Sequence, residues 1–125
     1  MSAIKGKNSR GELRVRKFLH RAGFRYRLHE SGLPGKPDIV LPRFNAVVFV
    51  HGCFWHQHRG CKEGRLPKSN VRFWRTKLDG NVRRDFRNVR RLRRQGLRVF
   101  IVWECDLSEA RLSRLAAALR RPLSS

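Results

Sequence analysis

Apolar residues recur every three or four positions between residues 10 and 22, and this spacing predicts a first helix. Gly23 follows the last apolar position, where many helices end on a glycine. Ser9 and Glu12 have the spacing of a capping box, in which each side chain bonds the backbone amide of the other residue. The sequence therefore marks both ends of this helix.

Three short segments then have the character of strands. Residues 24–28 alternate apolar and basic side chains, as a half-buried strand does. Residues 38–41 and 46–50 are short and rich in β-branched residues, and only four residues separate them. This close spacing predicts an antiparallel hairpin.

The next segment, residues 51–68, is rich in histidine, cysteine, glycine and charge and has no convincing period, so we expect an ordered loop. A long helical pattern begins at Ser69 or Asn70, either of which can cap a helix, and ends at residues 95–96. One apolar stripe runs along this helix, consisting of Val71, Trp74, Leu78, Val82, Val89 and Leu92.

The last two elements are a buried strand over residues 98–103 and an amphipathic helix over residues 108–119. The order helix, three strands, helix, strand, helix predicts one α/β domain over residues 1–125, with a mixed central sheet flanked by helices. We expect residues 1–8 to form a basic arm and residues 108–125 to form the C-terminal helix and tail.

The charge of the chain is strongly unbalanced. Its 125 residues include 30 Lys and Arg but only 9 Asp and Glu, a formal net charge of +21. A surplus of this size indicates a polyanionic partner, and nucleic acid is the first candidate. Codon bias in a GC-rich genome can favour arginine, but it does not explain the scarcity of acids.

Composition also limits the class of protein. Hydrophobic residues make up 40% of the chain, which argues against wholesale disorder. The longest apolar runs, residues 46–50 and 99–103, are far shorter than the roughly 20 residues of a membrane span. The N-terminus lacks the apolar region of a secretory signal. We therefore expect a cytoplasmic protein with no membrane segment.

Cysteine and histidine cluster in the loop. Cys53, His58 and Cys61 form a C-x4-H-x2-C pattern, and Cys105 follows the last predicted strand. Three cysteines and one histidine suit a closed, structural tetrahedral Zn²⁺ site better than disulfides in a cytoplasmic protein. Buried or free cysteines beside an unrelated surface histidine are the alternative.

A second site is predicted at the hairpin. Asp38 begins one strand, directly after Pro37, and His51 ends the next, so the hairpin can bring the two together. A carboxylate there can coordinate Mg²⁺, whose remaining ligands are phosphate and water oxygens. An ordinary turn aspartate after proline is the alternative.

Several motifs carry a resemblance to a known family. They are GFRYRLH at residues 23–29, LPGKPD at 33–38, FVHGCFWH at 49–56, Phe73-Trp74, NVRRD at 81–85 and VWEC at 102–105. Over about residues 3–107 the chain resembles the very short patch repair (Vsr) DNA mismatch endonucleases. The HGCFWH stretch is long and chemically unusual, which makes the resemblance specific.

The resemblance implies a restriction-endonuclease-like fold with a structural zinc loop. It also implies Mg²⁺-dependent nicking on the 5′ side of the mismatched thymine in T:G mispairs, which arise when 5-methylcytosine deaminates. That nick initiates very short patch repair. The implied partners are double-stranded DNA with a T:G mismatch, a functionally linked cytosine-5 DNA methyltransferase and other mismatch-repair proteins. The implied location is the nucleoid, and a monomer suffices to cut one strand.

Catalytic residues are carried over position by position. The resemblance makes Asp38 the principal Mg²⁺ ligand and the main-chain carbonyl of Val50 a second one. His51 and His56 match histidines that organise water and phosphate or assist proton transfer, and which of them is the base stays open. The second acidic residue and the lysine of the usual restriction-enzyme motif are absent, so the histidines replace part of that chemistry.

Two further acids match the family site. Glu12 matches a supporting glutamate on the first helix, although its capping-box role explains it equally well. Asp85 lies on the apolar stripe of the long helix, where an unpaired charge is costly. It has either a supporting role at the site or a partner arginine. Cys53, His58, Cys61 and Cys105 match the zinc ligands of the family, whose members differ by one residue in the spacing between His58 and Cys61.

Residues that bind DNA also follow from the resemblance. Phe54 and Trp55, together with Trp74, match aromatics that wedge into the duplex beside the mismatch, and core packing is the alternative for each. Basic residues that could hold the backbone from the N-terminal side include Lys5, Lys7, Arg10 and Arg14. Seven arginines between residues 83 and 94 suggest a phosphate-facing or solvated surface.

Two other functions compete with a mismatch nickase. A zinc-stabilised DNA- or RNA-binding protein without activity needs only the charge and the cysteine spacing. A restriction or homing-type nuclease would cut both strands of perfectly paired DNA. Asp38 and His51 favour an enzyme over a binder, because a binder has no need of a cation site there.

Overall fold

A computed structural model describes residues 10–121 of the chain. The elements are α1 (Arg10–Arg21), β1 (Arg27–Leu28), β2 (Ile39–Leu41), the 3-10 helix η2 (Pro42–Phe44), β3 (Ala46–His51), the 3-10 helix η3 (Lys62–Gly64), α2 (Val71–Arg94), β4 (Arg98–Trp103) and α3 (Glu109–Arg120). Their order confirms the predicted α/β class. Among these described residues, no helix is both long and apolar enough to span a bilayer.

The four strands form one mixed sheet in the order β1-β2-β3-β4. The predicted hairpin is confirmed, because β2 and β3 are antiparallel, with Ile39 opposite Val48. Strands β3 and β4 are parallel along their full length, from Ala46 opposite Arg98 to His51 opposite Trp103. A parallel pair needs a long crossover, and α2 supplies it.

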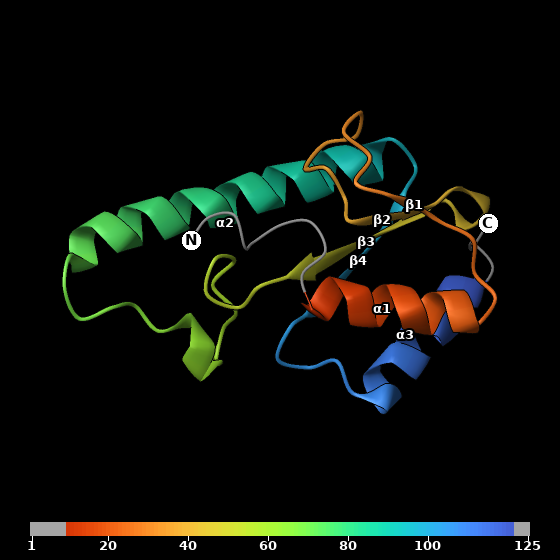
Figure 1. Ribbon diagram of the computed structural model, residues 1–125. Helices are drawn as coiled ribbons and strands as arrows, with labels where there is room; N and C mark the ends of the chain where they lie inside the picture. The colour runs from red at the N-terminus through yellow and green to blue at the C-terminus, as the bar shows by residue number, and fades with distance from the viewer. Residues whose placement is uncertain (1–9, 122–125) are drawn as a thin grey trace.

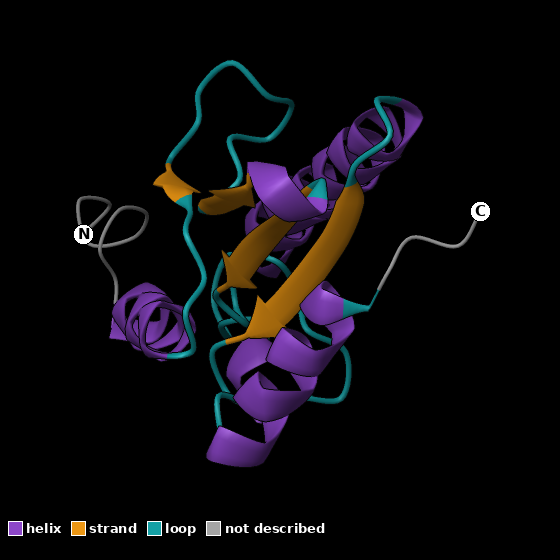
Figure 2. Cartoon of the chain, turned by 90° about the vertical axis from the view of Figure 1, so that its right-hand side faces the viewer, coloured by secondary structure: helices purple, strands orange, loops and turns teal. Residues whose placement is uncertain are grey.

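Helices cover both faces of the sheet: the C-terminal half of α2 lies on one face, while its N-terminal half extends beyond the strands, and α1 and α3 lie side by side on the other face (Figures 1 and 2). Strand residues alternate between the two faces, as a pleated strand requires. Ile39, Leu41 and Val48 pack with the apolar residues of α1 and α3. Val40 and Val47 pack instead with Leu92 of α2. Both faces are therefore buried.

Two details of the elements differ from the prediction. The strand predicted over residues 24–28 is reduced to Arg27–Leu28, because Phe24 belongs to the end of α1. The amide of Phe24 donates to the Leu19 carbonyl, and the amide of Gly23, whose φ is 96°, donates to the His20 carbonyl. This is the hydrogen-bond pattern of a Schellman cap. Asn70 does precede α2, but its backbone lies in the left-handed region and its side chain makes no capping hydrogen bond. Ser9, the predicted cap of α1, lies outside the described residues.

Arg98 ties the last helix to the sheet. Its guanidinium donates to the carbonyls of Ala118 and Leu119, in the final turn of α3, at 3.2 and 2.9 Å. It also donates to the carbonyls of Arg121 and Phe44 at 3.2 and 2.9 Å. The last carbonyls of a helix lack partners within the helix and carry partial negative charge. Arg98 supplies both the donors and the charge.

Replacing Arg98 by methionine keeps most of the aliphatic volume and removes all four donors. Hydrogen bonds to a charged group contribute about 1.5–3 kcal/mol each, but these four are exposed or only partly buried, so water replaces part of them. We therefore expect Arg98→Met to lower the free energy of unfolding by about 2 kcal/mol. Urea denaturation measures the change. The exposed Arg94→Met is the matched control and should stay within about 0.5 kcal/mol of the wild type; equal effects of the two substitutions would contradict the role of Arg98.

Candidate active site

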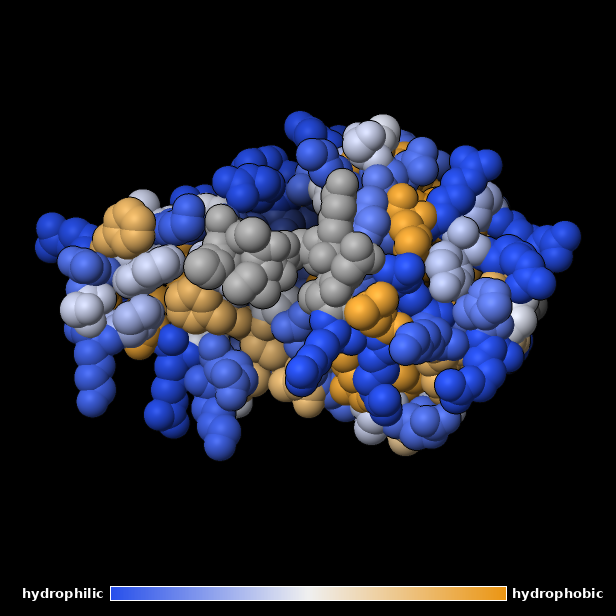
Figure 3. All heavy atoms as spheres, viewed as in Figure 1, coloured by the Kyte–Doolittle hydropathy of each residue, from blue (hydrophilic) through white to orange (hydrophobic). Residues whose placement is uncertain are grey.

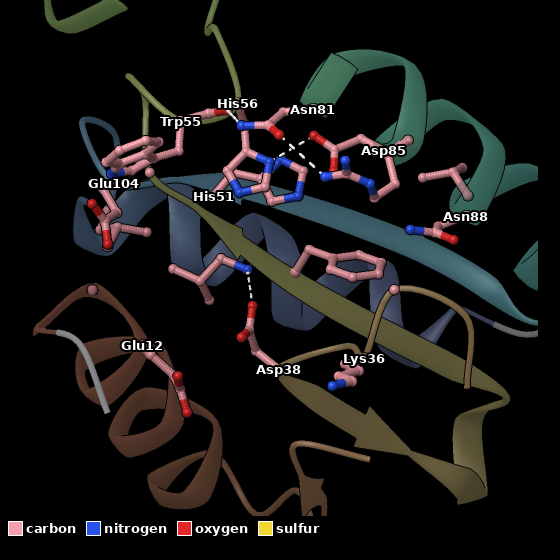
Figure 4. A pocket seen from close by; sticks show the side chains of 18 of the residues that line it. Glu12, Lys36, Asp38, His51, Trp55, His56, Asn81, Asp85, Asn88 and Glu104 are labelled. Carbon is pink, nitrogen blue, oxygen red and sulfur yellow. Dashed lines mark hydrogen bonds and ion pairs between the residues drawn. The ribbon is translucent and has the colours of Figure 1, made fainter. Parts of the chain in front are cut away.

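A groove opens where the β2–β3 hairpin ends, between α1 and α2 (Figure 4). Its walls come from the start of α1, the turn before β2, the end of β3, the middle of α2 and the segment after β4. The predicted catalytic and magnesium-binding residues that line it are Glu12, Asp38, Val50, His51, His56 and Asp85, and the predicted DNA-binding residues Arg10, Arg14 and Trp55 line it too. The fold thus brings together side chains that are up to 73 positions apart in the sequence (Glu12 to Asp85, 85 − 12).

Asp38 is held at the end of the hairpin by a backbone donor. The amide of Val50 donates to Asp38 Oδ2 at 2.7 Å across the two strands. Burial nevertheless raises the pKa of Asp38 to about 6, although the Val50 amide lowers it, and the nearby charge of Glu12 raises it further. The charges of His29 and His56 also lower this pKa, but burial outweighs them.

His51 and His56 form a parallel stack. Their ring centroids lie 3.7 Å apart with an interplanar angle of 5°. His51 is 5% exposed, and burial, together with His56, lowers its pKa to about 4. His51 is therefore neutral at physiological pH and can accept a proton or donate a neutral hydrogen bond.

The turn after β3 folds His56 back over His51. The amide of His56 donates to the Gly52 carbonyl at 3.1 Å, which closes a helix-like turn. Asn81 of α2 donates from its side chain to the Trp55 carbonyl at 3.2 Å and docks this turn on the helix. On the same helix, Asp85 Oδ2 lies 2.6 Å from His56 Nδ1. The partner of Asp85 in the described chain is thus a histidine, not the arginine of the alternative prediction.

Glu12 faces inward from α1. Its side chain is 1% exposed, and its Oε2 lies 2.8 Å from His29 Nε2 and 3.7 Å from Arg16 Nη1. Ligand atoms of Glu12, His29 and Asp38 all lie within 4.8 Å of one another. Glu12 therefore lies at the Asp38 end of the groove, whatever it contributes to the start of its helix.

The four predicted zinc ligands also converge. His58 Nδ1 lies 3.3 Å from Cys105 Sγ and 3.7 Å from Cys53 Sγ, and the ligand atoms of these three residues and Cys61 lie within 4.8 Å of one another. Ordinary tetrahedral Zn²⁺ bonds would separate a sulfur from a nitrogen ligand by about 3.5 Å. All three cysteines are free thiols. The donor set and its spacing fit a tetrahedral metal.

One aromatic ring connects this cysteine cluster to the histidine stack. Trp103, the last residue of β4, stacks on His58 with a centroid distance of 4.2 Å and an interplanar angle of 5°. The same indole meets His51 edge-on at 5.1 Å. Distortion of the cysteine cluster would therefore reach the catalytic end of the groove through a single side chain.

Three predicted wedge aromatics form a cluster outside the core. The ring of Phe54 lies 5.0 Å from that of Trp55 and 5.6 Å from that of Trp74. None of the three belongs to either hydrophobic core cluster, and all are only partly buried. Phe73 extends the cluster, with its ring 5.1 Å from Trp74 and 59% of its surface exposed. Core packing therefore does not explain them.

Comparison with known proteins gives a consistent answer. The family model described as DNA mismatch endonuclease Vsr matches residues 1–63. The type II nicking enzyme V.XorIIP of Xanthomonas oryzae pv. oryzae is 49% identical over 123 residues, covering 98% of this chain and 88% of that protein. V.NmeAIP, a type II nicking enzyme of Neisseria meningitidis serogroup A, is 46% identical, covering 91% and 81%. DNA mismatch endonuclease Vsr of Escherichia coli K12 is 41% identical over 107 residues, covering 86% and 68%.

This chain belongs to the Vsr family. It is therefore a DNA mismatch endonuclease, a nuclease that acts on phosphodiester bonds, as the sequence motifs predicted. The similarity to named nicking enzymes also identifies it as a DNA nicking endonuclease. A nucleic-acid-binding protein without activity is excluded by this membership.

The basic residues of this Vsr protein lie around the groove and on α2. Arg10 and Arg14 line the groove, and the Arg14 guanidinium also donates to the Leu107 carbonyl. Lys5 and Lys7 lie outside the described residues. The seven arginines between residues 83 and 94 are all exposed, and hydrophilic side chains dominate the face of the molecule that Figure 3 shows.

Sequence reasoning missed three residues around this Vsr site. Trp103 stands inside the VWEC motif, where its place at the end of a predicted strand, two residues before Cys105, was the available signal. Phe73 precedes Trp74 in a quoted motif but was not assigned to the DNA surface. His29 ends another quoted motif, and only the pairing of β1 with β2 reveals its contact with Glu12.

The raised pKa of Asp38 makes the fold less stable at neutral pH. The unfolded carboxyl ionises near 3.8 and the folded one near 6, so stability falls as pH rises between these values and stays reduced above them. Asp38→Asn keeps an acceptor for the Val50 amide without the charge. We expect this variant to unfold with a free energy about 1–3 kcal/mol higher than the wild type at pH 7.5.

Urea denaturation in Mg²⁺-free buffer measures this difference. A chelator must be left out, because it would also strip a metal bound at the cysteine cluster. The difference between the proteins should shrink as pH falls toward 4, and other titrating groups, His51 included, cancel in the comparison. A wild type as stable as Asp38→Asn at pH 7.5 would contradict the electrostatic strain at Asp38.

Proposed function

We propose that this protein is a Mg²⁺-dependent endonuclease that nicks DNA on the 5′ side of the mismatched thymine in T:G mispairs. Such mispairs arise from deamination of 5-methylcytosine, and the nick would initiate very short patch repair. The observation that carries the proposal is the groove in which Asp38, the His51–His56 stack and Asp85 meet. The mismatch activity named for the Escherichia coli relative supports the substrate.

The residues at the hairpin end fit a hard divalent cation. The Asp38 carboxylate and the main-chain carbonyl of Val50 would hold Mg²⁺, with Glu12 close by, because oxygen donors are the ligands it prefers. A positive charge there would also offset the cost of burying the ionised carboxylate, which raises the pKa of Asp38 to about 6. When bound, Mg²⁺ supplies stabilisation of the negative charge that develops on the scissile phosphate.

The histidines divide the proton chemistry between them. A carboxylate oxygen only accepts, so the 2.6 Å contact with Asp85 has His56 Nδ1 donating and leaves His56 Nε2 as the basic nitrogen. We assign His56 as the proton acceptor for the attacking water, with Asp85 holding the ring and stabilising its charged form. Neutral His51, stacked beneath it, fixes the ring plane and can donate a hydrogen bond to phosphate.

Mismatch selection would reside in the aromatic cluster of Phe54, Trp55 and Trp74. A wobble pair stacks less well than a normal pair, so opening the step beside it costs less. Each aromatic–base stack returns about 1–3 kcal/mol, comparable with the cost of opening one step. The partial exposure of the three rings leaves them available for such stacking.

Phosphate contacts would hold the duplex over the groove. Arg10 and Arg14 lie beside it, and we propose that Lys5 and Lys7 add contacts from the N-terminal arm. The exposed arginines of α2 extend the positive surface. Because each neutralised phosphate adds to affinity without reading sequence, these residues bind double-stranded DNA and leave the choice of base pair to the aromatics.

The cysteine cluster would hold a structural Zn²⁺. Burial raises the pKa of the Cys53 thiol to about 12, whereas a hydrogen bond from the Glu63 amide lowers that of Cys61. A cation among these sulfurs would favour the thiolate form of each. With four protein ligands and no open position, the metal would pin the loop and leave catalysis to the groove.

The biological setting follows from this substrate. We propose a restriction-endonuclease-like domain that acts as a monomer, since one strand is cut by one site. A chromosomal substrate implies a cytoplasmic, nucleoid-associated protein. The formation of T:G mispairs from 5-methylcytosine implies a functional link to a cytosine-5 DNA methyltransferase and to mismatch-repair proteins that complete the reaction.

A labelled duplex with a single T:G mispair tests the proposed reaction. We expect Mg²⁺-dependent cleavage of only the strand that carries the thymine, and a loss of at least about a thousandfold in rate with Asp38→Ala, because the cation loses its anionic ligand. Denaturing gel electrophoresis maps the cut. A perfectly paired duplex of the same sequence is the control substrate; cutting of both its strands would support a restriction-type nuclease instead.

Metal analysis tests the cysteine cluster. We expect the purified protein to contain about one Zn²⁺ per chain, because four convergent ligands bind it tightly at neutral pH. Cys61→Ser should lose most of it, while Asp38→Ala should keep it. Inductively coupled plasma mass spectrometry gives the content. Zinc retained in Cys61→Ser, or no zinc in the wild type, would argue against this site.

A further inference from the structure

A second group of side chains lies behind Asp38, arranged around Glu12. His29 provides the short contact in this group, with its Nε2 2.8 Å from Glu12 Oε2. Arg16 approaches the same oxygen at 3.7 Å. The His29 ring approaches Glu12 at an ion-pair distance but does not form a hydrogen bond with it. The position of the ring limits where the Glu12 carboxylate can lie, and Arg16 contributes charge.

The β1–β2 ladder determines where His29 lies. Leu28 is opposite Ile39 in antiparallel register, so the next pair is His29 and Asp38. The His29 amide donates to the Asp38 carbonyl at 3.1 Å. Its backbone then enters the left-handed region, at φ 51°, which histidine adopts more readily than most residues other than glycine. The amide of His29 thus holds Asp38 while its imidazole reaches α1.

We propose that His29 is a positioning residue for the cation site: its imidazole lies 2.8 Å from the Glu12 carboxylate and holds it beside Asp38, so that both present oxygens to one divalent cation. His29 does not line the groove itself, so it acts through Glu12 and not on DNA. This inference rests on the proposed Mg²⁺ site at Asp38 and assigns a residue that the nuclease chemistry did not require.

The physical reason lies in the burial of Glu12. Its side chain is 1% exposed, so no bulk water orients it, and like charge from Asp38 favours a position turned away from the cation site. The His29 imidazole, 2.8 Å from Oε2, opposes that motion by its position. Partners of this kind outside the ligand set change metal affinity by about 10- to 100-fold when they are removed.

Two substitutions at His29 and one control separate positioning from folding. His29→Ala removes the imidazole, and His29→Gln retains a polar side chain whose N–H can reach Glu12. His20→Ala removes an exposed histidine of α1 as the matched control. Mn²⁺ binding, followed by electron paramagnetic resonance, is measured for each protein bound to a T:G duplex with a non-hydrolysable linkage at the nick position. Nicking of an ordinary T:G duplex at varied Mg²⁺ concentration is measured in parallel.

We expect His29→Ala to weaken Mn²⁺ binding about 10- to 100-fold and to raise the Mg²⁺ concentration for half-maximal nicking by the same factor, with unchanged KM for the duplex. His29→Gln should recover most of the affinity, and His20→Ala should match the wild type. Unaltered Mn²⁺ affinity in folded His29→Ala, or a glutamine variant as defective as alanine, would overturn the inference.

A double substitution keeps the test valid if His29→Ala does not fold. In the Glu12→Gln background the buried charge is absent, so His29→Ala should fold and cause no further loss of Mn²⁺ affinity. A further loss of tenfold or more would show that His29 does not act through Glu12. Failure of the wild type to bind Mn²⁺ or to nick the T:G duplex would instead overturn the proposed function, and the inference with it.

Discussion

The hydrogen bond from the Val50 amide to the Asp38 carboxylate is the constraint on which the site depends. It crosses the end of the β2–β3 hairpin at 2.7 Å and fixes the acid relative to the backbone of β3. The next residue along that strand is His51, whose ring lies under His56. One hairpin thus carries both the candidate cation ligand and the first imidazole, and register alone sets their separation.

The irregular loop after β3 has two functions that its packing joins. His56 reaches back to the groove, whereas Cys53 and His58 contribute to the metal-ligand cluster only a few residues away. Trp103 contacts both groups, face-on with His58 and edge-on with His51. A loop with so little regular secondary structure needs cross-links to hold an imidazole in place, and the cysteine cluster and the Asn81 contact supply them.

Local patterns predicted most of the fold, because helix spacing, β-branched runs and a short turn are all readable over a few residues. The strand predicted over residues 24–28 was too long, because Phe24 takes part in the C-terminal cap of α1 and the strand begins only after it. Pairing between distant elements was less accessible. The location of Asp85 on an apolar stripe marked it as unusual, but its partner His56 is 29 residues away on a loop without period. The contact between His29 and Glu12 likewise depends on strand register.

The distribution of charge supports a cation in this groove. Four of the nine acidic residues of the chain, Glu12, Asp38, Asp85 and Glu104, line it, together with Arg10, Arg14, Lys36 and Arg84. The surplus of arginine attracts DNA over the whole surface, but at the proposed cutting position a phosphate would meet the Asp38 carboxylate with Glu12 close by. A divalent cation between Asp38 and the phosphate would convert that repulsion into two attractions. On this proposal, the long-range attraction of DNA and the local place for a metal both follow from the same unequal placement of charge.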